Sequence, residues 1–103
     1  MITGKLSNGF KFKVDENAIK SAEFRDILAG TVSDDTQKKI IANSELLTFL
    51  IGEEAKKELY ALIRKKEGTK YVNVETIDAL TLEIMGQLDE KDKDIKNSES
   101  SPT

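Results

Sequence analysis

Several residue types that carry chemistry are missing or scarce in this chain of 103 residues. It has no cysteine, no histidine and no tryptophan, and only one proline. Without cysteine there are no disulfides and no thiol catalysis, and without cysteine and histidine there are no zinc sites of the usual kind and no Ser-His or Cys-His nucleophiles. The composition therefore argues against an enzyme, and we expect no catalytic residues, no metal and no cofactor.

Long hydrophobic runs are also missing. The longest apolar stretch, residues 46–51, is interrupted by Thr48 and is far shorter than the roughly 20 residues that span a bilayer. No apolar signal-peptide core follows Met1. We therefore expect a cytoplasmic protein that makes no membrane contact.

Charge is abundant but nearly balanced. Charged residues make up 34% of the chain and hydrophobic residues 38%, and the net charge is -3. This balance gives no global positive field to attract nucleic acid, and it supports one small core under a charged surface. From Asp89 onward eight of fifteen residues are charged and only Ile95 is large and apolar. We therefore expect one folded domain over residues 1–88 and a disordered tail over residues 89–103.

The first residues carry the clearest local pattern, that of a β-hairpin. Apolar and polar side chains alternate over residues 2–6 and again over residues 10–14, and the loop sequence Ser-Asn-Gly at residues 7–9 separates the two runs. A slip of one residue would turn every side chain to the other face. Only a three-residue loop, which pairs Leu6 with Phe10, puts the apolar side chains of both strands on one face.

Helical periodicity dominates the rest of the chain. We expect helical structure between Asp15 and Ala29, after a turn, with Ser21 as the cap of residues 22–29 and Gly30 as their end. Further helices are expected from a cap among residues 33–35 to Ile51, from Glu53 to the turn at Gly68, and after Asn73 to Leu88. The second helix, which ends at Ile51, has an apolar arc of about 200°, wider than the stripe of a surface helix, so we expect it to be central. The predicted fold is α+β and mainly α, with an N-terminal β-hairpin packed on a small bundle of three to four helices.

Four helical residues are candidates for contacts with a partner. Asn43 and Phe49 lie inside the apolar arc of the second helix, and Tyr60 and Leu82 fall about 60° outside the stripes of their helices. The alternative interpretation is structural, because a buried asparagine is normally hydrogen-bonded and single exposed apolar residues are common.

Three lysines form a second candidate surface, on the outer face of the hairpin. In the predicted register Lys5 lies opposite Lys11, and Lys13 lies opposite Thr3. Lysines on an exposed sheet edge protect it against aggregation, which is the structural interpretation. The functional interpretation is a basic ridge that binds an acidic segment of a partner.

Three segments resemble one protein family. Residues 2–17, ITGKLSNGFKFKVDEN, look like the start of the small tail assembly chaperones of tailed bacteriophages and prophages. Residues 52–60, GEEAKKELY, are similar to the middle helix of that family. The glycine turn at Gly68 and residues 72–75, VNVE, resemble the opening of its last helix. The resemblance covers most of residues 1–90.

The resemblance implies a chaperone that acts in the cytoplasm of the bacterial host and is not part of the mature virion. Such proteins bind the long, hydrophobic, helical tape measure protein, keep it soluble and help recruit tail-tube subunits, without a cofactor. In this family a ribosomal frameshift often yields a longer product, which is commonly taken to contact the tail-tube protein. The residues Ile95-Lys96-Asn97 are compatible with an A-rich slippery sequence. A homo-oligomer is left open.

The competing interpretation is a small phage-encoded regulatory or nucleic-acid-associated adaptor. A clustered basic face would favour the adaptor, whereas a contiguous apolar groove would favour the chaperone.

Overall fold

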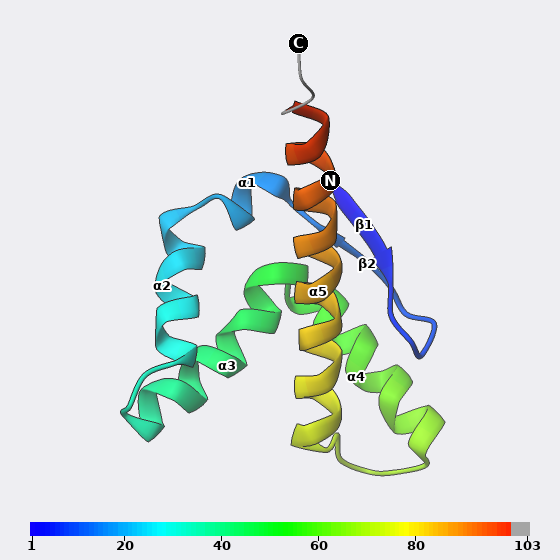
Figure 1. Cartoon of the computed structure of the whole chain (residues 1–103). Helices are drawn as coiled ribbons and strands as arrows, with labels where there is room; N and C mark the ends of the chain where they lie inside the picture. Colours follow the sequence, from blue (N-terminus) through cyan, green and yellow to red (C-terminus); the bar gives the residue numbers. More distant parts are fainter. Residues whose placement is uncertain (100–103) are drawn as a thin grey trace.

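The computed structural model describes residues 1–99, with side chains for residues 1–91. In this part of the chain a two-stranded hairpin precedes five helices (Figure 1). The elements are β1 (Ile2–Lys5), β2 (Lys11–Val14), α1 (Glu16–Ile19), α2 (Ala22–Thr31), α3 (Thr36–Ile51), α4 (Glu53–Glu67) and α5 (Val74–Glu99). The α+β, mainly α fold class is confirmed, and the helical segment predicted after Asp15 is divided into the single turn of α1 and the longer α2.

The hairpin has the predicted register. The strands are antiparallel and pair Ile2 with Val14 and Gly4 with Phe12. The loop closes with a hydrogen bond from the Leu6 backbone N–H to the Phe10 carbonyl, 2.8 Å long. Within the loop Gly9 has a φ of 93°, a left-handed conformation that glycine adopts at little cost. The inner face of the hairpin is therefore apolar, and its outer face carries lysines.

Glycine at position 4 allows the hairpin to lie close to α5. A Cβ atom at this position would lie 2.4 Å from Cζ of Phe12 and 2.3 Å from Oε1 of Gln87. The amide of Gln87 in turn donates a hydrogen bond of 2.9 Å to the Lys5 carbonyl. One turn further along α5, the Lys91 ammonium donates to the Thr3 carbonyl. The side chains of α5 thus satisfy the outward carbonyls of β1.

The helix ends follow the capping residues in the sequence. Asp35 is the cap of α3, and its carboxylate accepts hydrogen bonds from the backbone N–H groups of residues 37 and 38. Asn73 caps α5 by accepting from the Glu75 N–H at 2.8 Å. Gly52 ends α3 with a φ of 86°, and Gly68 ends α4 with a φ of 65°.

One predicted helix end is wrong. The sequence places the end of α2 at Gly30, but the helix continues through this residue to Thr31. A Cβ atom on Gly30 would lie 2.6 Å from Cβ of Ala42. This glycine therefore serves close packing of α2 against α3, rather than helix termination.

The predicted boundary after Leu88 is also too early. Leu88 is buried, as expected, but α5 continues to Glu99, and Lys91 bonds to the hairpin. Disorder is therefore wrong for residues 89–91, because a helix anchored by buried residues extends through polar ones that contact β1. Residues 92–99 are described as backbone alone, and the rest of the expected tail, residues 100–103, lies outside the described residues.

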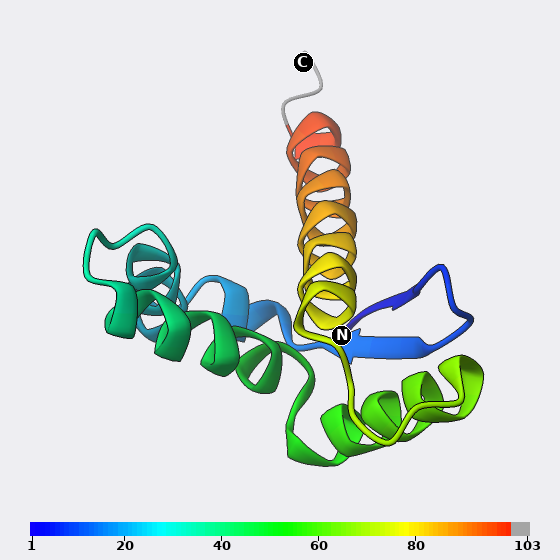
Figure 2. The same ribbon diagram turned by 90° about the horizontal axis from the view of Figure 1, so that it is seen from below.

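The elements are arranged around α3 and α5. As predicted, α3 is central, since it packs against α1, α2, α4, α5 and β2. The pair α2–α3 extends to one side of α5, and the hairpin and α4 lie on the other (Figure 2). The radius of gyration is 15.0 Å, compared with about 13 Å for a compact domain of this length. This open arrangement leaves apolar helix surface uncovered.

Candidate functional site

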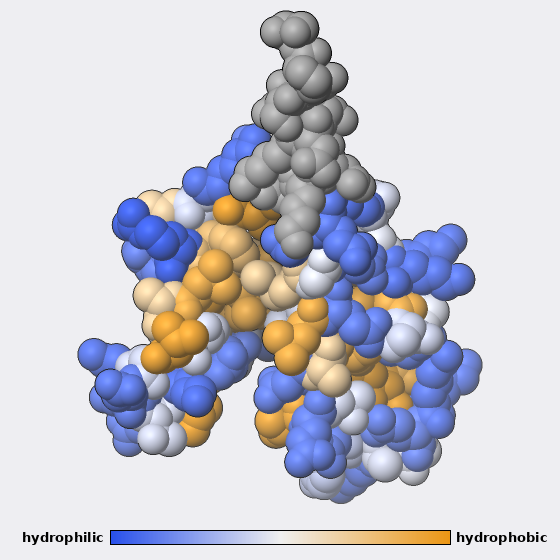
Figure 3. Space-filling model, viewed as in Figure 1, coloured by the Kyte–Doolittle hydropathy of each residue, from blue (hydrophilic) through white to orange (hydrophobic). Residues whose placement is uncertain are grey.

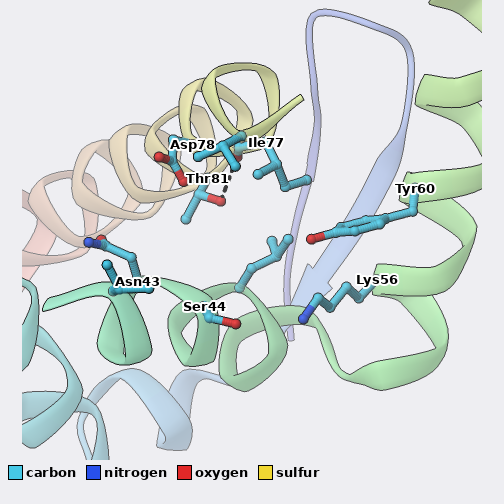
Figure 4. A pocket seen from close by; sticks show the side chains of 10 residues that line it. Asn43, Ser44, Lys56, Tyr60, Ile77, Asp78 and Thr81 are labelled. Carbon is cyan, nitrogen blue, oxygen red and sulfur yellow. Dashed lines mark hydrogen bonds between the residues drawn. The ribbon is translucent and has the colours of Figure 1, made fainter. Parts of the chain in front are cut away.

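A groove of about 240 Å³ lies where α3, α4 and α5 meet (Figure 4). We call it the α3–α4–α5 groove. One wall is α3, the opposite wall is the N-terminal half of α5, and α4 closes one end. On the face of the molecule shown in Figure 3, apolar side chains also gather between α2 and α5.

The α3 wall combines apolar and polar side chains. Leu47 is buried, whereas Ile40, about two turns earlier on the same helix face, is 64% exposed. Asn43 and Ser44 also line this wall and are exposed. The amide of Asn43 donates a hydrogen bond of 2.9 Å to the Lys39 carbonyl. This bond uses the nitrogen of the amide, so its oxygen is left to accept from another group.

The α5 wall also combines apolar and polar side chains. Ile77 is half-buried, Thr81 is buried, and Val74 is 69% exposed. The Thr81 hydroxyl donates to the Ile77 carbonyl at 2.8 Å, so it needs no other acceptor. Asp78 is exposed on this wall, and no described residue hydrogen-bonds to its carboxylate or forms an ion pair with it.

The α4 end of the groove carries a cation that already has contacts within the fold. The Lys56 ammonium donates to the Thr48 hydroxyl at 3.0 Å and lies 5.7 Å from the centroid of the Tyr60 ring. The guanidinium of Arg64 lies 5.9 Å from the same ring. Figure 4 shows Lys56 and Tyr60 at one end and Asn43 and Asp78 at the other. The groove is therefore polarised, with hydrogen-bond acceptors at one end and an engaged cation at the opposite end.

The structure brings two of the four helical candidates into this groove, namely Asn43 and Tyr60. Phe49 is elsewhere, because its ring stacks on Phe24 with centroids 6.1 Å apart and the planes inclined by 12°. It is half-buried and packs against the core, so it lies outside the groove. Leu82 is 70% exposed but does not line the groove.

The lysine surface is separate from the groove. Lys5, Lys11 and Lys13 are exposed on the outer face of the hairpin, with Lys5 opposite Lys11 as predicted. They border a shallow hollow that residues of β1 and β2 line. This geometry fits both interpretations, an edge protected by charge and a basic ridge.

Sequence reasoning missed the exposed residues at the rim of the groove. Ile40 and Val74 belong to apolar stripes that the periodicity assigns to the interior. The signal that could have distinguished them is their position at the N-terminal ends of α3 and α5, where neighbouring helices no longer cover the stripe.

The hairpin loop is held beside a second hollow, which is lined by residues of the loop, α4 and α5. The Ser7 backbone N–H and hydroxyl donate to the two oxygens of Glu83, at 2.8 and 2.7 Å. The Lys66 ammonium donates to the Asn8 carbonyl at 2.6 Å. These bonds hold the loop against α5 and α4.

No group of three or more carboxylates in the described part of the chain is arranged to hold a metal ion. None of its described helices combines the length and apolar character needed to cross a membrane. A scan against protein-family models, a search of curated proteins and a search of solved structures each find no match to this chain.

Proposed function

We propose that this chain is a tail assembly chaperone of a tailed bacteriophage or prophage that binds helices of the tape measure protein. The α3–α4–α5 groove is the observation that carries the proposal, together with the resemblance of residues 2–17 and 52–60. A groove between helices, with apolar side chains in its walls and exposed aliphatic residues at its rim, suits the apolar stripe of an amphipathic helix.

The chaperone acts by covering apolar surface. A long hydrophobic helical protein aggregates through its apolar stripes until assembly buries them. A bound chaperone removes part of that stripe from water and presents its own charged surface instead. Reversible binding then lets the tape measure protein pass to the tail-tube subunits.

The adaptor interpretation has less support. Two lysines of α4, Lys56 and Lys66, hydrogen-bond within the fold, to Thr48 and to the Asn8 carbonyl. A nucleic-acid binder would gather such cations on one face, free to contact phosphates.

Co-expression with the neighbouring tape measure reading frame tests the proposal. We expect the tape measure protein to stay soluble with this chain and to aggregate without it. Replacing rim residues, as in Val74→Asp or Ile40→Asp, should weaken binding about tenfold or more, because the lost apolar burial costs over 1 kcal/mol. Both side chains are exposed, so the substitutions leave the core intact.

Matched controls locate the contact. Ile41→Asp introduces the same charge on α3 at an exposed position outside the groove, and binding should be unchanged. Leu82→Asp should weaken binding less than Val74→Asp, if the bound helix continues along α5. Binding of DNA at physiological salt, with no effect on the tape measure protein, would favour the adaptor instead.

The longer product is part of the same proposal and is tested separately. The gene should contain a slippery run near the codons for residues 95–97 and an overlapping downstream frame. Mass spectrometry of infected or induced cells should then find a minor, longer protein that binds the tail-tube protein. A gene without either feature contradicts this part alone.

A further inference from the structure

We infer that the α3–α4–α5 groove binds an amphipathic helix that carries two apolar anchor residues one turn apart and an arginine one turn beyond the second anchor. The guanidinium of this arginine is bound between Asp78 and Asn43. This inference rests on the proposed function, since it specifies the chemistry of the helix that the groove binds.

The size of the groove favours side chains of a helix over a small molecule. Its volume of about 240 Å³ is below the range of about 300–1,000 Å³ that is typical of small-molecule sites. It exceeds the roughly 150 Å³ of an apolar cavity that holds one benzene ring. Two aliphatic side chains one turn apart therefore fit between Leu47 and Ile77, while Ile40 and Val74 contact the sides of the helix.

The acceptor end of the groove requires a donor from the partner. The carboxylate of Asp78 has no partner among the described residues, and the amide oxygen of Asn43 is likewise free to accept. Burying them under a bound helix without a donor would cost free energy. A cation on the bound helix removes that cost.

Arginine fits this end better than lysine. Its planar guanidinium presents donors in a fixed fork, which can reach acceptors on two different helices at once. Asp78 comes from α5 and Asn43 from α3, on opposite walls of the groove. The opposite end does not call for an anion, because Lys56 already contacts Thr48 and Tyr60. The arginine therefore also sets the direction in which the helix lies.

A second copy of this chain is a poorer occupant. Its arginines are Arg25 and Arg64. Arg64 lies over the ring of Tyr60. The large apolar residue one turn from Arg25 is Leu28, which packs against the core, and the exposed neighbours of Arg25 at that spacing are Ala22 and Ala29. Neither arginine offers the required pattern.

A charge-swap experiment with synthetic peptides tests the inference. Two labelled helical peptides of about 20 residues, long enough to form helix, share leucines at positions i and i+4. At position i+8 one carries arginine and the other glutamate. In fluorescence anisotropy titrations we expect the arginine peptide to bind about fivefold more tightly, the scale of an exposed ion pair.

Variants of the protein test whether Asp78 and Asn43 cause the preference for arginine. Asp78→Lys should reverse it, whereas Glu45→Lys, an equal charge change on the exposed side of α3 outside the groove, should shift both peptides alike. Asn43→Ala should remove the preference for arginine over lysine in a third, lysine-containing peptide. Sedimentation of the free protein provides the test for self-association.

Three results would contradict the inference, and each has a different meaning for the groove. Equal affinity for the arginine and glutamate peptides, with binding still lost in Val74→Asp, overturns the arginine inference and leaves the proposed function standing. No binding of any peptide, while the tape measure protein is still solubilised, overturns this groove as the site. Self-association that Val74→Asp abolishes and that excludes the peptides identifies a second copy as the occupant, against our inference.

Discussion

Phe12 connects three parts of the molecule through one side chain. It lies on the inner face of β2, is 2% exposed, and covers Gly4 on the paired strand. The same glycine faces Gln87 of α5, so the ring, the strand and the helix meet where no side chain intervenes. Because the packing is this close, there is no room for a larger residue at position 4, and no smaller side chain can fill the space of the Phe12 ring.

We expect Phe12→Ala to lower the free energy of unfolding by about 3–5 kcal/mol, because it leaves a cavity at the centre of the hairpin contact. Urea denaturation followed by circular dichroism measures the change. Lys11→Ala, on the outer face beside it, is the control and should change stability by less than about 0.5 kcal/mol. Equal melting of the Phe12→Ala variant and the parent would mean that this face is not core.

A second prediction for a single side chain concerns Glu83, whose two carboxylate oxygens both accept hydrogen bonds from Ser7. Glu83→Ala removes both hydrogen bonds from Ser7 and should destabilise the protein by about 1 kcal/mol. Glu90→Ala, at an exposed position on the same helix, should have almost no effect. Hydrogen exchange should show faster opening of the hairpin loop in the first variant only.

At the scale of elements, two glycines inside helices have different roles. Gly30 lies in α2 where a Cβ would overlap Cβ of Ala42, so α2 and α3 approach closely only because this position has no side chain. Gly86 lies in α5 with no atom within 4 Å of an added Cβ. Alanine has the better helix propensity at both positions, so packing alone distinguishes them.

The two alanine substitutions should therefore have opposite signs. Gly86→Ala should stabilise the protein by about 0.5–1 kcal/mol through helix propensity. Gly30→Ala should destabilise it by about 1–3 kcal/mol, because α2 must move away from α3. Thermal unfolding of both variants checks this, and stabilisation by Gly30→Ala would show that the contact between these helices can relax.

Elements were predictable where local chemistry decides them. The hairpin register follows from alternation and the Ser-Asn-Gly loop, and the cap Asn73 follows from its side-chain oxygen. The cap of α3 was predictable only as one of residues 33–35, and the structure selects Asp35. The end of α2 was not predictable in this way. Glycine serves both as a terminator and as a small residue at a contact, and only the position of Ala42 distinguishes the two roles.

At the scale of the whole molecule, the arrangement of the helices determines which apolar residues are exposed, and the sequence alone does not show this. Periodicity assigned Ile40 and Val74 to apolar faces but could not show that α3 and α5 diverge and leave both exposed. Periodicity named Phe49 as a candidate contact residue, and nothing local in the sequence shows that the ring of Phe24 stacks on it. The sequence therefore predicted only part of the lining of the groove, namely Asn43 and Tyr60.

The extent of the folded unit is a prediction at this scale. Deleting residues 92–103 should change the free energy of unfolding by less than about 0.5 kcal/mol, because the segment contains one large apolar residue among twelve. Deleting residues 88–103 should cost at least about 2 kcal/mol, because it removes the buried Leu88. Urea denaturation of the two truncated proteins measures the difference, and equal stability would place Leu88 outside the core.

The continuity of α5 has a consequence for the binding of two partners by one molecule. Asp78, at the acceptor end of the groove, and Glu99 are joined by one uninterrupted helix, which spans about 30 Å at the usual rise per residue. A segment appended after Glu99 would begin at the end of α5 remote from the groove. A polypeptide captured there and a helix held in the groove would not compete for space, so one copy of the chain could bridge two components that must meet in order.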